Sequence, residues 1–278
     1  MVVLPTIGDP FFTAVMRGIH KAAREKGYSV VIEETQRNTM TADEIGAMMV
    51  SKQTDGIILL ASMSPFGTEI LSAKSRRRLP IVIGCETVSP ELTDLPSVHI
   101  DNVAAAKDAT NYLIDQGHTK IAMIYGEESS LLTKDRELGY REAMTSAGLA
   151  IEDGWVAEGK LTLAGARQAT RELLSQQNRP TAIFCANDET AIGCLHEIKS
   201  AGFSVPDDIS VIGFDDIRYA AVTDPPLTTI SQPGEEIGER VMNRLYRQIE
   251  NGISANSTPE IVAHRLVVRQ SVSKQSQL

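Results

Sequence analysis

The sequence has few cysteines and few aromatic residues: three cysteines, one tryptophan and 5% aromatic residues in a chain of 278. Cys85, Cys185 and Cys194 include no closely spaced CxxC pair, and their number is odd. A disulfide framework or a zinc site would use paired cysteines. We therefore expect buried free thiols in a reducing compartment, and no metal site.

The chain also lacks a long hydrophobic run and an excess of basic residues. No apolar stretch approaches the roughly 20 residues that a membrane-spanning helix requires. Residues 1–5 (MVVLP) have neither the basic region nor the small-residue cleavage site of a signal peptide. The formal net charge is −9, which argues against binding of a nucleic-acid backbone by these residues alone. We expect a cytoplasmic protein with no membrane contact.

The motifs of the common enzyme classes are missing. The sequence has no GxxxxGK[ST] phosphate loop, no GxGxxG after the first strand, no GxSxG elbow and no HExxH pair. Asp215 and Asp216 are compatible with a general acid–base pair, the rim of a ligand cleft or a helix N-cap, but no second catalytic partner can be named. His118 follows Gly117, where an imidazole can bond the last carbonyls of a helix. We expect a protein that is not an enzyme and has no cofactor.

Strands and helices alternate through the whole sequence. Short apolar runs are typical of strands covered on both faces, and apolar residues at helical spacing indicate the helices between them. Asp9 before Pro10 opens one helix, and residues 41–44 (TADE) open another as a capping box. Strands are expected at residues 2–4, 28–33, 56–60, 81–84, 120–125, 181–185, 210–214, 228–231 and 261–268. Helices are expected from residue 10, from residue 41, at 67–78, from 102 to 116, and at 135–147, 164–175, 189–201 and 235–250.

This order of elements predicts two doubly wound parallel α/β lobes of similar size. Ligands of parallel sheets bind beyond the carboxyl ends of the strands. The loops expected there, residues 5–9, 61–66, 84–87, 125–136, 186–188 and 215–219, are rich in polar and aromatic residues. Such loops are suited to line a cleft for a polar ligand.

Eight stretches, in this order along the chain, resemble the effector-binding core of the lac repressor family of transcription regulators. They are residues 9–12 (DPFF), 55–58 (DGII), 98–102 (VHIDN), 117–122 (GHTKIA), 136–140 (RELGY), 180–188 (PTAIFCAND), 205–216 (VPDDISVIGFDD) and 225–230 (PPLTTI). Residues 65–67 and 95–102 are similar to the cytidine repressor branch, which implies a nucleoside or pentose-like effector.

The resemblance implies a periplasmic-binding-protein-like fold of type I, in which a three-strand hinge joins the two lobes. The crossings are expected near Asn102, Ile230 and Thr258. The N-terminal lobe would then comprise residues 1–101 and 231–258, and the C-terminal lobe residues 102–230 and 259–278. The sequence begins inside the first strand of this core, so we expect the DNA-binding headpiece of the family to be absent from it.

The resemblance also implies ligand contacts at seven positions, which are Phe11, Phe12, Arg136, Leu161, Asn187, Asp215 and Gln232. The two phenylalanines correspond to first-lobe residues that stack on the ligand, and Arg136 to an arginine that reaches its polar groups. Asn187 and Asp215 correspond to polar groups of the cleft, and Gln232 lies near the hinge. Leu161 departs from the family pattern, because many members have an aromatic ring there.

The function implied is that of an effector-sensing domain of a bacterial transcriptional repressor, which binds a small sugar or nucleoside between its lobes. Its partners would be the effector, a second copy of the chain in a homodimer, and operator DNA through the headpiece. The homodimer is also suggested by Met48, Met49 and Leu71, apolar residues that we expect to face solvent, with a place partly in the core as the alternative. A periplasmic sugar-binding protein of a transport system shares the fold and is the alternative. A hydrolase or transferase is disfavoured, because no nucleophile–base pair is present.

Overall fold

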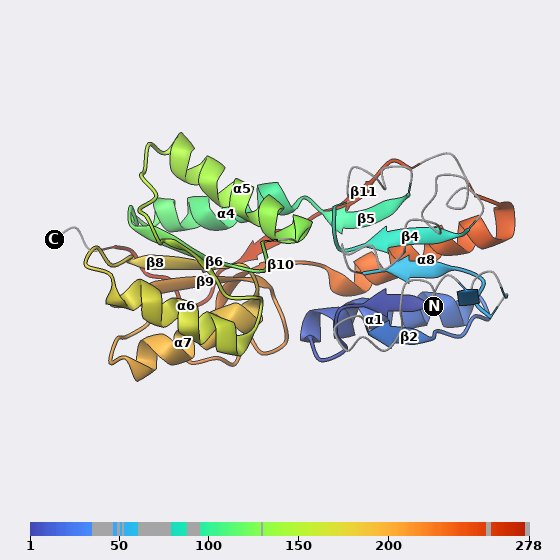
Figure 1. Ribbon diagram of the computed structural model, residues 1–278, viewed down its shortest axis with the longest axis horizontal. Helices are drawn as coiled ribbons and strands as arrows, with labels where there is room; N and C mark the ends of the chain where they lie inside the picture. Colours follow the sequence, from blue (N-terminus) through green and yellow to red (C-terminus); the bar gives the residue numbers. More distant parts are fainter. Residues whose placement is uncertain are drawn as a thin grey trace. The chain divides into compact units, whose positions relative to one another are not determined.

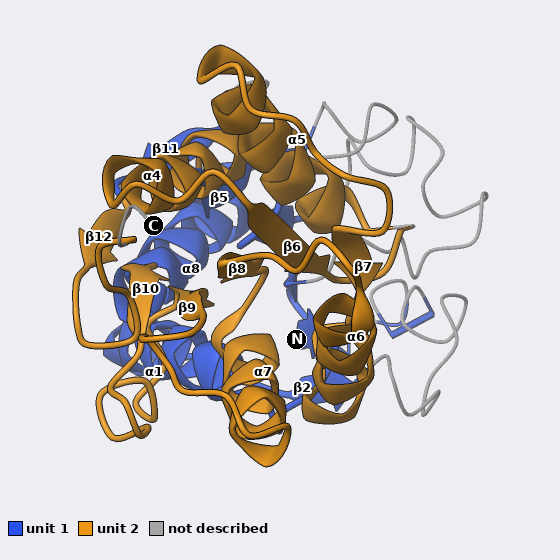
Figure 2. Cartoon of the chain, turned by 90° about the vertical axis from the view of Figure 1, so that its left-hand side faces the viewer, with its two compact units in different colours: residues 1–100, 233–263 blue, residues 101–232, 264–278 orange. Residues whose placement is uncertain are grey.

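The computed structural model describes residues 1–34, 47–48, 51, 53–60, 79–87, 95–128, 130–253 and 257–275 (Figure 1). The chain forms two compact units (Figure 2). Unit 1 comprises Met1–Ile100 and Pro233–Ala263, and unit 2 comprises Asp101–Gln232 and His264–Leu278. The chain therefore passes from one unit to the other three times.

Unit 1 contains a six-stranded sheet in the order β11-β5-β4-β3-β1-β2, and its strand pairs are parallel. The strands are β1 (Val2–Leu4), β2 (Ile32–Glu34), β3 (Ile57–Leu59), β4 (Ile81–Gly84), β5 (Ser97–Ile100) and β11 (Glu260–Val262). Apart from β2 and β11, the strands are buried, as their continuous apolar sequences predict. The helices expected from residue 41 and at residues 67–78 lie outside the described residues, apart from residues 47 and 48.

Two long helices of unit 1, α1 (Pro10–Glu25) and α8 (Gly234–Asn251), pack against each other. Asp9 caps α1 as predicted, because its side chain accepts a hydrogen bond from the Phe11 N–H. The two helices approach closely at Gly18 and Gly238, where a side chain would collide with backbone atoms of the other helix. Glycine is required at this contact for lack of space.

Unit 2 contains a second six-stranded sheet, in the order β12-β10-β9-β8-β6-β7. The strands are β6 (Ile121–Tyr125), β7 (Val156–Glu158), β8 (Ala182–Cys185), β9 (Ser210–Asp215), β10 (Thr228–Ser231) and β12 (Arg265–Val267). Among the described strand pairs of this sheet, only that of β12 with β10 is antiparallel. One face is covered by α4 (Asn102–Asp115) and α5 (Leu131–Ser146), the other by α6 (Leu163–Ser175) and α7 (Asp188–Ser200) (Figure 2). The predicted doubly wound α/β class is confirmed.

Three details of the sequence prediction are corrected. Residues 261–268 were expected as one extended segment of the second lobe, but they contribute to two strands of different sheets, β11 beside β5 and β12 beside β10. The last passage between the units therefore follows Ala263. Helix α5 begins at Leu131, where Ser130 is the N-cap, so Arg136 lies in its second turn and not at its start. His118 bonds Thr181 and the Ser273 carbonyl instead of the end of a helix.

The three cysteines are buried and free, as predicted. Among the described residues, no helix combines the length and apolar character needed to cross a bilayer.

Candidate functional site

Polar side chains gather in unit 2 around Arg136, which is only 2% exposed. Its Nε donates a hydrogen bond to Oδ1 of Asn102, the first residue of α4, over 3.1 Å. Its Nη1 donates to the carbonyl oxygen of Ala186, which directly follows β8. Arg136 thus connects α5 with the start of α4 and with the carboxyl end of a central strand.

The Arg136 guanidinium is paired with a carboxylate and stacks on an aromatic ring. Nη2 lies 3.7 Å from Oδ1 of Asp215, the last residue of β9, and both side chains are buried. The central guanidinium carbon lies 3.7 Å from the centre of the Phe214 ring, which is the geometry of a cation–π contact. A buried charge needs such partners, because leaving it unpaired is strongly unfavourable.

Gln232 extends this network at the end of β10. Its Nε2 donates to Oδ1 of Asp215 over 2.6 Å, and both residues are buried. Asp215 and Asp216 have φ values of +111° and +57°, which are rare for residues other than glycine. Backbone strain of this kind is concentrated at functional sites. Asp216 is held by Arg269, whose Nη2 lies 2.6 Å from Oδ1.

The side chains Asn102, Arg136, Asp215 and Gln232 therefore form one continuous chain of contacts, which we call the unit 2 network. Its two ends have unused bonding capacity: among the described residues, Asn102 Nδ2 and Gln232 Oε1 are buried without a hydrogen-bond partner. The hydroxyls of Thr133 and Thr190, also in unit 2, share this property. A buried polar group without a partner costs about 1–3 kcal/mol. This network is suited to bind a ligand that both donates and accepts hydrogen bonds.

Asn187 and Leu161 lie together beside this network. Oδ1 of Asn187 accepts from the Thr190 N–H over 2.9 Å and so caps α7. Its Nδ2 makes a long bond of 3.5 Å to the carbonyl of Leu161, a half-buried residue with φ of +54°. Asn187 follows Ala186, which contacts Arg136, so the structure places the five predicted unit 2 residues at or next to one network.

Asp188 is a second buried carboxylate of unit 2. Its Oδ1 accepts from the Thr229 hydroxyl over 2.6 Å and its Oδ2 from the Ile217 N–H over 2.8 Å. Loss of solvation nevertheless dominates and raises the pKa of Asp188 to about 7. Gly213 provides the space for this carboxylate, because a side chain at that position would collide with it.

The two remaining predicted residues, Phe11 and Phe12, belong to unit 1. They open α1, and their ring centres lie 5.5 Å apart in a tilted arrangement. Phe11 is buried and Phe12 is half-buried. The five other predicted residues are in unit 2.

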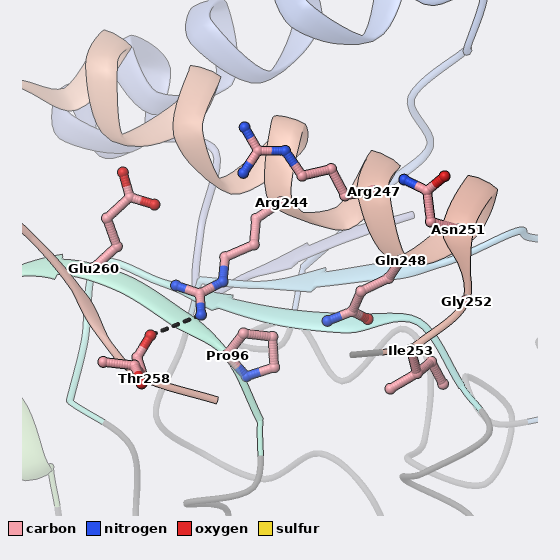
Figure 3. Close-up of a pocket in the computed structure, with 9 residues that line it drawn as sticks. All are labelled: Pro96, Arg244, Arg247, Gln248, Asn251, Gly252, Ile253, Thr258 and Glu260. Carbon is pink, nitrogen blue, oxygen red and sulfur yellow. Dashed lines mark hydrogen bonds between the residues drawn. The ribbon is translucent and has the colours of Figure 1, made fainter. Parts of the chain in front are cut away.

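Unit 1 has a pocket of its own, of about 490 Å³, at the end of α8 (Figure 3). Two of its lining side chains, Arg244 and Gln248, bond the backbone of neighbouring segments. Arg244 donates to the carbonyls of Ser97 and Thr258, and Gln248 bonds both the N–H and the carbonyl of Ile81. Figure 3 shows these two side chains extending from α8 toward the strands, whereas Arg247 points away from them. These contacts fasten α8 to the sheet.

Sequence reasoning missed Asn102 as a member of the site. The signal was present, because an asparagine that opens a helix directly after a buried strand stands where ligand contacts gather. Within the described ranges, no group of three or more His, Cys, Asp or Glu side chains is placed to hold a metal ion.

The fold and the unit 2 network define a ligand-binding protein of the periplasmic-binding-protein class. Residues 1–268 match the family described as periplasmic binding proteins and sugar binding domain of the LacI family. The chain belongs to this family, and it is the effector-sensing domain of a transcriptional regulator.

The relatives of the chain support a regulator and not a periplasmic transport protein. It is 38% identical to the HTH-type transcriptional repressor CytR of Escherichia coli K12, over 98% of this chain and 78% of the repressor. It is 36% identical to the ribose operon repressor of the same organism, over 87% and 72%. A solved LacI family regulator from Enterococcus faecium, with bound ribose, shares 25% identity over 99% of both chains, with a TM-score of 0.85. The cellobiose complex of the regulator CelR shares 27% identity over 97% of this chain and 83% of CelR, with a TM-score of 0.87.

Proposed function

We propose that the unit 2 network binds a pentose or a ribonucleoside as the effector of the regulator. The proposal rests on the buried Arg136–Asp215 pair and the two residues bonded to it. Among the described residues, Asn102 keeps a buried donor and Gln232 a buried acceptor without a hydrogen-bond partner. A sugar hydroxyl can donate and accept at once, so adjacent hydroxyls match both groups. Hydrocarbon ligands would leave these groups unpaired.

The relatives favour a five-carbon sugar. The Enterococcus faecium regulator has ribose bound, and one relative is the ribose operon repressor. The likeness to CytR agrees with the branch resemblance of the sequence, and that resemblance implies a nucleoside or pentose-like effector. Cellobiose, which is bound by CelR, is the larger sugar that serves as a contrast. We also propose that Phe11 and Phe12 stack on the ligand. Phe12→Ala should then weaken the binding of ribose or cytidine in the titration.

Thermal shift and calorimetric titration with ribose, cytidine and cellobiose test this proposal. A ligand at one hundred times its Kd stabilises the folded protein by about 2.7 kcal/mol, which is readily seen as a raised Tm. Ribose or cytidine should bind, and cellobiose should not. Arg136→Met should weaken binding by at least about thirtyfold, because loss of one member of a buried pair costs about 2–5 kcal/mol of affinity.

Arg141→Met is the matched control for this experiment. Arg141 lies on the same helix, is exposed and pairs with Glu137 one turn away. Its replacement should leave the affinity unchanged. If neither ribose nor cytidine binds, or if Arg136→Met binds as the parent protein does, the proposed function is wrong.

We further propose that the chain acts in the cytoplasm as a homodimer and reaches operator DNA through a headpiece outside this sequence. Of the helix residues cited in favour of a dimer, Met49 and Leu71 lie outside the described residues, and Met48 is half-buried. Support comes instead from Tyr219 and Val222 of unit 2, which are 42% and 77% exposed. Contiguous exposed apolar patches of about a few hundred Å² mark interaction surfaces, and we propose that these two side chains belong to such a patch. Light scattering should give twice the mass of 30.2 kDa, and Val222→Glu should lower it.

A further inference from the structure

We infer that Asn102 selects the effector: its Oδ1 orients Arg136, and its Nδ2 donates a hydrogen bond to an oxygen atom of the bound ligand. This inference rests on the proposed function and names a specificity residue for it. The observation is that Asn102 is 2% exposed, is bonded to Arg136 at one end of its amide, and is unpartnered among the described residues at the other end.

Helix formation does not explain an asparagine at this position. The N-cap of α4 is Asp101, whose Oδ1 accepts from the Ala104 N–H over 2.9 Å. Asn102 follows the cap, and among the described residues its side chain bonds Arg136 of α5 and not the backbone of its own helix. Asparagine is also a weaker helix former than alanine, which occupies the next three positions after Val103. The Asn102 side chain therefore does not stabilise the start of α4 by capping it.

The orientation of the Asn102 amide follows from its partner. A guanidinium only donates hydrogen bonds, so the atom that faces Arg136 Nε has to be the oxygen. The NH₂ group is thereby directed elsewhere, with two donors and no acceptor among the described residues. Rotating the amide would place two donors against each other. The position consequently offers a fixed donor to the ligand.

The amide of Gln232 is fixed in the same way, but here the NH₂ group is bonded and the oxygen is left over. Its Nε2 faces the carboxylate of Asp215, which only accepts, so its Oε1 is the atom that remains without a partner. The unit 2 network thus ends in a donor at Asn102 and an acceptor at Gln232. A ligand has to present an oxygen acceptor to the first and a hydrogen-bond donor to the second. Removing the oxygen that faces Asn102 should therefore weaken binding selectively.

The competing explanation is that Asn102 only holds Arg136 in place. The variant Asn102→Asp distinguishes the two explanations, because aspartate keeps the oxygen that faces Arg136 and lacks the NH₂ donor. If the role is only to orient Arg136, aspartate should support binding of every ligand about as well as asparagine does. If Nδ2 contacts the ligand, aspartate should lose one specific contact.

The experiment measures the Kd values of ribose and cytidine, and of 2-deoxyribose, 2′-deoxycytidine and 3′-deoxycytidine, by calorimetric titration. One deoxy analogue should bind the parent protein about tenfold more weakly than its hydroxylated counterpart, as expected for one lost hydrogen bond. Asn102→Asp should bind the hydroxylated ligand about tenfold more weakly or worse, and it should no longer distinguish it from that analogue. Asn111→Asp, on the same helix, is the control for the added charge and should keep the parent's selectivity.

Outcomes separate this inference from the proposed function. If the parent protein binds and Arg136→Met binds far more weakly, but Asn102→Asp keeps the parent's ratio of Kd values, only the role of Asn102 is overturned. If the parent binds neither ribose nor cytidine, both fall. Asn102→Ala, which has no side-chain donor, serves as the second variant should Asn102→Asp fail to fold, and it should lose the same discrimination.

Discussion

The buried pair of Arg136 and Asp215 should make a large contribution to the stability of unit 2, and a double-mutant cycle measures it. The variants are Arg136→Met, Asp215→Asn and the two combined. Methionine keeps much of the apolar contact with Phe214 but removes the charge and the bonds to Asn102 and Ala186. Asparagine keeps an oxygen for Gln232 and removes the negative charge.

The expected magnitudes follow from the burial of both partners. Removing one member of a buried ion pair typically destabilises a protein by about 3–5 kcal/mol, because the other charge stays buried without it. Each single variant should fall in this range. The double variant leaves no unmatched charge, so its loss should be smaller than the sum of the single losses by about 2 kcal/mol.

Trp155 provides a suitable probe for this measurement. It is the only tryptophan of the chain, it is buried in the core of unit 2, and its indole N–H donates to the Asn178 carbonyl. Its fluorescence during urea unfolding therefore reports on the unit that contains the pair. Arg141→Met, the exposed control, should leave the unfolding midpoint unchanged. If the loss of stability in the double variant equals the sum of the two single losses within about 0.5 kcal/mol, the two residues are not coupled and the interpretation is wrong.

Three further predictions concern stability. With the pKa of Asp188 raised to about 7, the folded protein holds a proton that the unfolded chain releases between about pH 4 and 7. The free energy of unfolding should consequently fall as the pH rises through this window, by up to about 4 kcal/mol, and Asp188→Asn should flatten that dependence in urea titrations at several pH values. Gln248→Leu should destabilise unit 1 by about 1–3 kcal/mol in guanidinium unfolding, because the Ile81 N–H loses its acceptor; an unchanged midpoint would contradict this. Gly238→Ala should lower the Tm, because its methyl group meets the backbone of Val15, whereas Gly252→Ala, in open space but with φ of +82°, tests conformational strain alone.

Much of the fold was predictable because it depends on local patterns. The alternation of apolar strands and helices, the Asp9 cap and the order of elements can all be recognised within windows of a few residues. The split of residues 261–268 was not, because an alternating sequence pairs equally well with either sheet. Which sheet receives β11 is decided by its neighbour β5, more than 150 residues earlier in the chain.

The site divides in the same way. Arg136, Asp215 and Gln232 were predicted by resemblance, and the structure places them in one network of contacts. Asn102 was missed because its role depends on a contact between two helices, 34 residues apart in the sequence. Asn187 was expected only as a ligand contact, but its side chain also caps α7, and such local bonds are typical of asparagine before a helix.

The threading of the chain through its two units has a consequence for the order of synthesis. Residues 1–100 leave the ribosome before residues 101–278. However, α8, which packs on β3, β4 and β5, and β11, which pairs with β5, come from residues after 232. Until those residues emerge, the first sheet has an uncovered apolar face and an unpaired edge, both of which invite misassociation. The sheet of unit 2 is likewise incomplete until β12 has been synthesised and pairs with β10. Nascent chains that stop at Gln232 should therefore be protease-sensitive in unit 1 although most of its strands have already been made.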